Sequence, residues 1–318
     1  MSARWRRWFP VVVVLLAVLA GCAEAPAAPA VPATPAPVGS PTPPAPPAAA
    51  SDAIGPHGPS VPEEPVALAR VLEDTQATIA DPARAPADVA AAARTAQVAY
   101  EELAFRPERL PAVLAALSPR VRESTDRIVG AGRSLLSMAK RGPGDMLPAW
   151  RIAAPRPPGE LRAIYAEAQD RFGVPWTVLA AVNLVESRMG RIVSHSEAGA
   201  RGPMQFMPST WASYGLGGDV TDPHDAILGA ANYLAANGGA TDAGLDRALE
   251  RYNNDDRYVR AVRAYATVMQ ADERAYLGFH AWEVYFRTTA GRVHLPVGYD
   301  EAEPVTAVAY LARTGAPR

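Results

Sequence analysis

The chain has 318 residues, 31 Lys+Arg against 33 Asp+Glu, 32 prolines and a single cysteine. A net charge of −2 provides no basic surface for a phosphate backbone, which argues against a nucleic-acid-binding protein. One cysteine also excludes an internal disulfide framework and a cysteine-rich metal site, and the length allows about two globular units.

Residues 1–21 have the pattern of a secretory signal peptide, because three arginines precede an apolar run over residues 8–20. This run is shorter than the about 20 apolar residues that span a bilayer. Residues 19–22, Leu-Ala-Gly-Cys, resemble the lipobox of bacterial lipoproteins, in which the cysteine is lipidated and the signal is cut before it. The resemblance implies lipidation of Cys22 and an extracytoplasmic protein anchored to the cell membrane. An uncleaved anchor or an ordinary secretory signal remains an alternative.

Residues 22–62 are predicted to form a disordered Pro/Ala-rich spacer. Fourteen of the 32 prolines lie in residues 23–65, and no aromatic residue occurs between Phe9 and Tyr100. Such a segment cannot bury enough apolar surface to offset its conformational entropy. Without residues 1–21 the chain has 28 Lys+Arg against 33 Asp+Glu, so we expect lipid rather than charge to be the tether.

Residues 63–142 change to a helical periodicity rich in Ala, Leu, Val and Arg. The pattern predicts helices over residues 64–80, 87–105 and 107–140, with Pro111 and Pro119 as first-turn or kink positions. Tyr100 and Phe105 are the aromatic residues of this region, so its core is expected to be thin. We therefore predict a small helical hairpin or bundle that packs against the following domain. We find no catalytic constellation in it.

The main core and the site are expected in residues 143–300, because 18 of the 23 aromatic residues lie after position 142. A helix over residues 160–172 is predicted to end at Gly173, and a second helix to open at Pro175. The second helix is apolar nearly all round and carries Glu186 in its last turn. Apolar neighbours and the negative end of the helix dipole both raise the pKa of such a carboxyl, as a general acid requires.

A structural role for Glu186 is the alternative, in which its carboxylate pairs with Arg188 or Arg191. The residues that follow favour catalysis. They contain a Glu-Ser pair at 186–187, a Ser-x-x-Gly-Ala stretch at 196–200, a Gly-x-Met-Gln-x-Met-Pro stretch at 202–208, and a Tyr-Asn pair at 252–253. This series, over about residues 147–270, resembles the lytic transglycosylases of bacterial cell walls, whose fold is goose-type lysozyme-like.

The resemblance implies that Glu186 is the catalytic acid/base, and that Ser196, Gln205, Met207, Tyr252 and Asn253 bind the substrate. It implies peptidoglycan glycan strands as the substrate and 1,6-anhydro-N-acetylmuramic acid ends as the product, with no cofactor and no metal. Pro203 departs from the family, where Leu or Ala is common, and removes one backbone donor. Protein partners are not indicated.

A second catalytic acid would make the protein a muramidase-type hydrolase instead. Glu197, beside Ser196, is the candidate for that base. Asp222 and Asp255 read as helix N-caps, and the aspartates at 219, 222 and 225 do not match a calcium-binding loop. A non-catalytic wall-binding lipoprotein is a third alternative, although such a protein would lack Glu186.

Short alternating runs at 283–287 and 292–296 predict a β-hairpin, and a short helix is expected near 304–312. We assign residues 301–318 to a C-terminal tail. The predicted fold class is thus mainly α: a lysozyme-like catalytic domain with a small C-terminal hairpin, preceded by a helical region and a disordered spacer.

Overall fold

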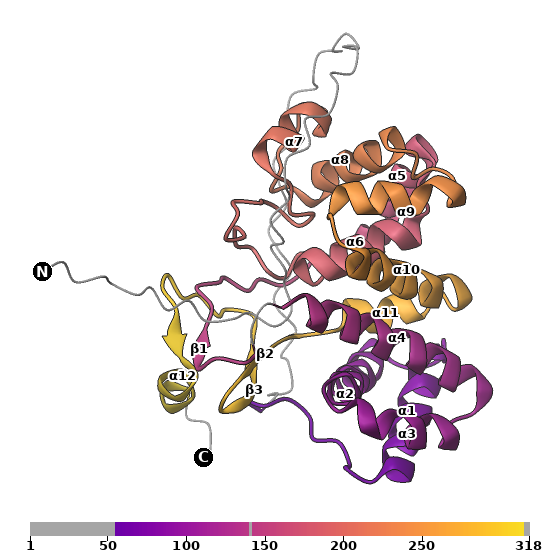
Figure 1. Ribbon diagram of the computed structural model, residues 1–318, viewed down its shortest axis with the longest axis vertical. Helices are drawn as coiled ribbons and strands as arrows, with labels where there is room; N and C mark the ends of the chain where they lie inside the picture. Colours follow the sequence, from indigo (N-terminus) through magenta and orange to yellow (C-terminus); the bar gives the residue numbers. More distant parts are fainter. Residues whose placement is uncertain (1–54, 140–141, 315–318) are drawn as a thin grey trace, which may run out of the picture.

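The computed structural model describes residues 55–139 and 142–314 (Figure 1). The signal peptide, Cys22 and most of the expected spacer lie outside the described residues. The fold is mainly helical with a small C-terminal hairpin, which confirms the predicted fold class. No helix in the described part of the chain combines the length and the apolar character needed to cross a bilayer.

The first helical region contains α1 (Pro65–Ala80), α2 (Pro86–Phe105), a 3-10 turn at Pro107–Arg109, α3 (Leu110–Ala116) and α4 (Pro119–Met138). The segment expected over 107–140 is not one continuous helix, and Pro119, predicted as a first-turn or kink position, is the first residue of α4. Ser118 has an extended backbone, with ψ at 154°, as the residue before a proline prefers. The breaks at 81–82 and 106–107 are confirmed.

The second helical region contains α5 (Pro158–Phe172), α6 (Trp176–Ser187), α7 (Pro208–Tyr214), α8 (Pro223–Ala236), α9 (Asp242–Tyr252), α10 (Asp256–Ala271) and α11 (Ala275–His280). Gly173 ends α5 in the left-handed conformation, as predicted. Asp222 and Asp255 cap α8 and α10, which confirms both predicted N-caps. Six of the described helices begin with proline, a residue whose fixed φ suits the first helical position.

Helix α10 joins the two helical regions, because it packs against α4 on one side and α6 on the other (Figure 1). One continuous hydrophobic core runs from Leu68 in α1 to Trp282 after α11. The first helical region therefore shares the core of the second, as its predicted shortage of aromatic residues led us to expect. This arrangement fixes α10, and with it the site described below.

The hairpin consists of β2 (Val284–Thr288) and β3 (Gly291–Leu295), antiparallel, with Val284 paired to Leu295. The expected tail is structured in part. Strand β4 (Val305–Thr306) pairs with β1 (Met146–Leu147), and α12 (Ala307–Arg313) follows it. These elements share a second, smaller core with the hairpin.

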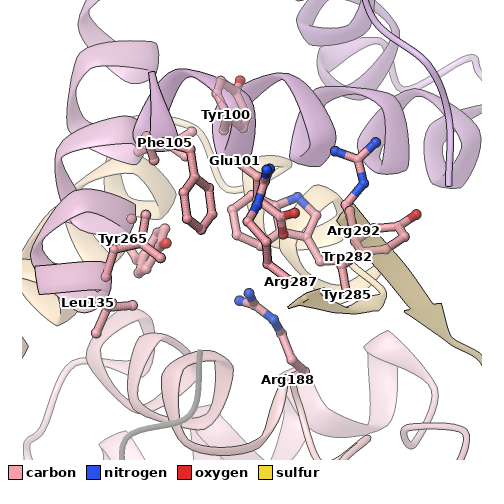
Figure 2. A pocket seen from close by; sticks show the side chains of 14 residues that line it. Tyr100, Glu101, Phe105, Leu135, Arg188, Tyr265, Trp282, Tyr285, Arg287 and Arg292 are labelled. Atoms are coloured by element: carbon pink, nitrogen blue, oxygen red, sulfur yellow. The ribbon is translucent and has the colours of Figure 1, made fainter. Parts of the chain in front are cut away.

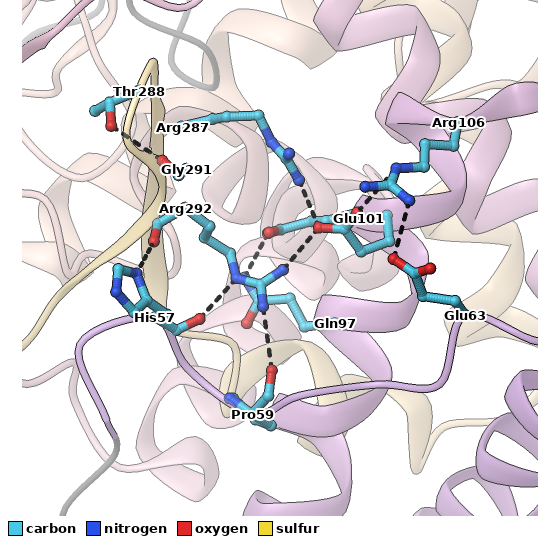
Figure 3. A network of polar contacts seen from close by, with 11 residues as sticks. His57, Pro59, Glu63, Gln97, Glu101, Arg106, Arg287, Thr288, Gly291 and Arg292 are labelled. Carbon is cyan, nitrogen blue, oxygen red and sulfur yellow. Dashed lines mark hydrogen bonds and ion pairs between the residues drawn. The ribbon is translucent and has the colours of Figure 1, made fainter. Parts of the chain in front are cut away.

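Residues 55–62, the end of the expected spacer, lie along the hairpin (Figure 3). The Arg292 guanidinium donates hydrogen bonds to the carbonyl oxygens of His57 at 2.9 Å and Pro59 at 3.1 Å. The His57 ring nitrogen Nδ1 lies 2.7 Å from the Arg292 carbonyl oxygen. The chain is thus fastened to the hairpin before α1 begins.

Candidate active site

Glu186 lies in the last turn of α6, where the sequence placed it, and its side chain is 7% exposed. Nearly every residue of α6 is buried, so the apolar helix packs on all sides. Glu186 Oε1 accepts a hydrogen bond of 2.7 Å from the hydroxyl of Tyr258, which is in the first turn of α10 and 1% exposed. Two helices that enclose the same core therefore hold this carboxyl group.

Burial raises the pKa of Glu186 to about 8, and the hydrogen bond from Tyr258 lowers it in part. The raised pKa favours the protonated carboxyl group at neutral pH. A protonated carboxylic acid in a buried position is what general acid catalysis near neutral pH requires. Glu186 makes no ion pair with Arg188 or Arg191 in the described structure, so the structural alternative for Glu186 is not supported.

Helix α6 ends immediately after Glu186 in an unusual backbone. Arg188 and Met189 both adopt positive φ, at 54° and 60°, and Gly190 follows at 85°. Residues with a Cβ seldom adopt this conformation, so the surrounding packing must hold the turn in place. The turn directs the chain away from the end of α6 and into the loop that contains the next motif.

The loop of the Gly-Pro-Met-Gln stretch is tied to α6 through its carbonyl oxygens. Pro203 O accepts hydrogen bonds from Ser187 Oγ at 2.5 Å and from Asn183 Nδ2 at 2.8 Å. The Tyr165 hydroxyl donates to Asn183 Oδ1 at 2.6 Å, which fixes the orientation of that amide. Ser187, the second residue of the Glu-Ser pair, thus anchors the motif loop beside the carboxyl group.

Gly202 makes this loop possible. Its φ is 74°, and a Cβ atom there would lie 1.8 Å from the carbonyl oxygen of Val220. On either side of the turn, Arg201 and Phe206 form an isolated antiparallel bridge with hydrogen bonds of 2.9 and 2.8 Å. Only glycine satisfies both the backbone conformation and the close approach.

Two of the predicted substrate-binding residues shape the loops. Gln205, at φ 50°, donates from Nε2 to the Gly202 carbonyl at 2.9 Å. Ser196 Oγ accepts a hydrogen bond of 2.9 Å from the Ala200 amide and closes the 196–200 turn. Met207 is the N-cap residue of α7 and is half-buried. In the described structure none of these three contacts Glu186 by a hydrogen bond.

Tyr252 and Asn253 lie where α9 ends. The Tyr252 hydroxyl donates to the Met204 carbonyl at 2.7 Å, so it holds the motif loop and not the carboxyl group. Its ring is parallel to that of Tyr258, with the centroids 6.4 Å apart. Asn253 Oδ1 is buried without a hydrogen-bond partner among the described residues, which leaves an unused acceptor at the end of α9.

The comparisons with known proteins match this part of the chain. Residues 163–274 match the family model of the transglycosylase SLT domain. The matched segment is 112 of the 318 residues, about a third of the chain. A curated protein similar to the chain is the membrane-bound lytic murein transglycosylase F of Thiobacillus denitrificans, 32% identical over 123 residues. The match covers 37% of this chain and 26% of that protein, so the chain spans about a quarter of the relative's length. No solved structure matches.

The other acidic residues of the SLT domain are exposed or have structural partners. Glu197 is exposed. Asp222 accepts from the His224 amide at 2.8 Å and pairs with Arg156 at 3.0 Å, whereas Asp225 accepts from the Asp219 amide at 2.9 Å. Asp222, His224 and Asp225 come close enough to hold a metal ion in principle, but these bonds already engage both carboxylates.

The aromatic side chains of the SLT domain serve packing. Trp176 and Phe206 are buried, and Phe206 packs edge to face on Trp211 at 5.2 Å and on Tyr252 at 5.9 Å. Phe206 is part of the motif loop, but its side chain is only 3% exposed, so its ring is not available to stack on a sugar.

Sequence reasoning missed Tyr258 and Asn183. Tyr258 lies six residues after Tyr252 and shares the buried face of α10 with Tyr265. Its only sequence signal is an aromatic residue on an amphipathic helix, which core tyrosines share. Asn183 carries a clearer signal, because it is a polar residue in an otherwise apolar helix and a buried amide requires hydrogen-bond partners.

Proposed function

We propose that the protein is a peptidoglycan lytic transglycosylase that cleaves the β-1,4 bond between N-acetylmuramic acid and N-acetylglucosamine, with Glu186 as its single acid/base. The observation that carries the proposal is a buried carboxyl group that accepts a hydrogen bond from Tyr258, within the segment that matches the transglycosylase SLT domain. The similarity to a protein named as a lytic murein transglycosylase supports it.

In the first step Glu186 donates its proton to the glycosidic oxygen, and that bond breaks. The acetamido group of the muramic acid stabilises the positive charge at the anomeric carbon. In the second step the Glu186 carboxylate removes the proton from the muramyl C6 hydroxyl, whose oxygen attacks the anomeric carbon and closes the 1,6-anhydro ring. Glu186 ends in its original protonated form, and no water is consumed.

The environment of Glu186 suits both steps. Burial makes the group a carboxylic acid at the start, and the Tyr258 hydroxyl stabilises the carboxylate that forms after proton transfer. Asn253 Oδ1, a buried acceptor without a partner in the described structure, is suited to an N–H or O–H of the substrate. We further propose that Ser196, Gln205, Met207 and Tyr252 line the sugar cleft on the anchored loops.

A muramidase of the same fold remains the second candidate, since it uses the same acid. It requires a carboxylate to activate water, and Glu197 is the candidate for that role. The masses of the products distinguish the two functions. We expect the purified protein to release muropeptides from isolated peptidoglycan that are one water lighter than hydrolytic products; release of hydrated reducing ends alone would establish the muramidase.

We also propose that Cys22 carries the lipid anchor and places the enzyme outside the cytoplasm, against its wall substrate. The relative from Thiobacillus denitrificans is named as membrane-bound. Residues 23–54 would then connect the lipid to the point at which the chain meets the hairpin, near His57. A non-catalytic wall-binding lipoprotein is disfavoured by the retained and protonated Glu186.

A further inference from the structure

A pocket apart from the Glu186 site lies where the two helical regions and the β2–β3 hairpin meet (Figure 2). Helices α2 and α4 contribute Phe105 and Leu135, α10 contributes Tyr265, and Trp282 lies between α11 and the hairpin. Its cavity volume is about 40 Å³. Since one water needs about 10–15 Å³ of such volume, the cavity has the space of about three waters, which suits a small ligand.

Arg188 is the notable residue of this pocket. Its side chain is 7% exposed and rises from the end of α6 toward the middle of the pocket (Figure 2). The guanidinium lies 5.4 Å from the ring centre of Trp282. Within residues 55–139 and 142–314, no hydrogen bond or ion pair engages this guanidinium. The Glu101 carboxyl group lines the same pocket without an ion pair to Arg188; burial raises the pKa of Glu101, and the charge of Arg188 lowers it only in part. The guanidinium is therefore incompletely compensated, and a bound anion would stabilise it further.

The other two cations of the pocket already have a partner. Arg287 and Arg292 both pair with Glu102, at 2.7 and 3.1 Å. Arg287 also lies over the Phe105 ring, 3.8 Å from its centre. Glu101 accepts a hydrogen bond of 2.9 Å from Gln97. These contacts leave Arg188 as the cation available to a ligand among the described lining residues.

The lining determines the chemistry of the ligand. A guanidinium presents a planar pair of donors that matches a carboxylate. Leu135, Tyr265 and Trp282 give the rest of the wall an apolar surface. The nearby Glu101 carboxyl group and the small volume disfavour a larger, doubly charged anion such as phosphate. A single carboxylate on a short apolar body fits both the charge and the space.

We propose that this pocket binds a small apolar carboxylate through Arg188. Two sources share this chemistry: a free short-chain carboxylic acid, and the terminal carboxylate of a peptidoglycan peptide stem. The second source rests on the proposed function. Arg188 follows Glu186 by two residues, and Tyr265 lies about two helical turns beyond Tyr258 on the same buried face of α10. A ligand here would therefore bridge the two elements that hold the catalytic carboxyl group.

Calorimetric titration of the purified full-length protein with propionate, and with propionamide as its uncharged isostere, tests the proposal. We expect saturable binding of propionate in the millimolar range and no binding of propionamide. Arg188→Met and Arg188→Lys should each weaken propionate binding by about tenfold or more, because both remove the paired donors. If Arg188→Met does not fold, the Arg188→Lys variant and the comparison with propionamide still test whether Arg188 binds the carboxylate.

Arg162→Met is the matched control, because the Arg162 guanidinium also lies over a tryptophan, 3.9 Å from the Trp176 ring centre, but outside the pocket. This variant should bind propionate as the wild type does. Equal binding of propionate and propionamide would overturn the proposal, as would no saturable binding of propionate or unchanged binding in both Arg188 variants.

Competition experiments identify the source. In a Glu186→Gln background, which prevents turnover, a disaccharide-peptide and the same disaccharide without its peptide are each added to the propionate-loaded protein. Displacement by the peptide-bearing compound alone identifies the stem. Displacement by neither, with propionate still bound through Arg188, identifies a free acid. Because binding is measured without cleavage, this result is independent of whether the protein proves to be a transglycosylase.

Discussion

The Tyr258 hydroxyl donates a 2.7 Å hydrogen bond to Glu186 Oε1, across the interface between α10 and α6. The bond opposes the effect of burial, because it stabilises the charged carboxylate that burial disfavours. Tyr258 therefore positions the carboxyl group and limits how far its pKa rises.

Replacement of Tyr258 by Phe removes this bond, so the pKa of Glu186 should rise above its value of about 8. The acid must be protonated to act, and activity falls as pH rises through that pKa. We therefore expect the alkaline limb of the kcat/KM profile to move to higher pH. We also expect kcat to fall by about tenfold or more, because the carboxyl group loses its fixed position.

Tyr252→Phe is the control for this measurement, because the Tyr252 hydroxyl bonds to the Met204 carbonyl and not to Glu186. Its alkaline limb should stay where it is in the wild type, even if loosening of the motif loop lowers the rate. Identical pH profiles for Tyr258→Phe and the wild type would contradict the role given to Tyr258.

Glu186 should also make the stability of the protein depend on pH. Its pKa rises from 4.5 to about 8 on folding, so the folded state binds this proton more tightly than the unfolded chain does. The stabilisation is complete below pH 4.5 and is lost as pH rises through about 8. In Glu186→Gln, which cannot titrate, this contribution is absent.

Urea unfolding of the wild type and Glu186→Gln at several pH values measures the effect. Between about pH 5 and pH 8, the free energy of unfolding of the wild type should fall relative to the variant by several kcal/mol. A difference between the two proteins that stays constant over this range would show that the pKa of Glu186 is not raised.

The connection between α6 and α7 offers a matched pair of glycines. Both Gly202 and Gly199 have positive φ, at 74° and 87°, but a Cβ at Gly202 would collide with the Val220 carbonyl whereas a Cβ at Gly199 meets nothing within 4 Å. Gly199→Ala should lower the free energy of unfolding by about 1 kcal/mol through backbone strain alone. Gly202→Ala should lower it by more than about 3 kcal/mol or displace the loop, with loss of activity. Similar thermal unfolding curves for the two variants would contradict this account of the loop.

Much of the fold follows from local sequence signals. The position of Glu186 in the last turn of a buried helix, the caps at Asp222 and Asp255, and the hairpin all depend on residues close in the chain. The start of α4 at Pro119 also follows from a local signal, because proline favours the first turn of a helix.

The contacts that complete the site depend on tertiary packing instead. Tyr258 reaches Glu186 only because α10 lies against α6 in one register, which no local pattern in the sequence specifies. The pairing of β1 with β4 joins segments about 160 residues apart and gives only two-residue strands, too short for a periodic signal. The burial of Arg188 likewise depends on α2 and the hairpin, two elements that are far from it in the sequence and line the same pocket.

Cys22, which lies outside the described residues, gives a prediction about location. In the native host, the wild type should fractionate with membranes and incorporate labelled palmitate, whereas Cys22→Ser should lose the label. A lipid anchor binds through apolar burial and not through charge, so high salt should not release the wild type. A wild-type protein without the label, or one washed off by salt, would contradict the proposed anchor.

The most direct test of the central claim is the release of 1,6-anhydro muropeptides from isolated peptidoglycan by the wild type, Glu186→Gln and Glu197→Gln, followed by mass spectrometry. We expect anhydro products from the wild type and from Glu197→Gln at similar rates, since Glu197 is exposed. Glu186→Gln should lose activity by about a thousandfold, because a single group supplies both proton transfers. Undiminished cleavage by Glu186→Gln would contradict the claim that Glu186 is the acid/base.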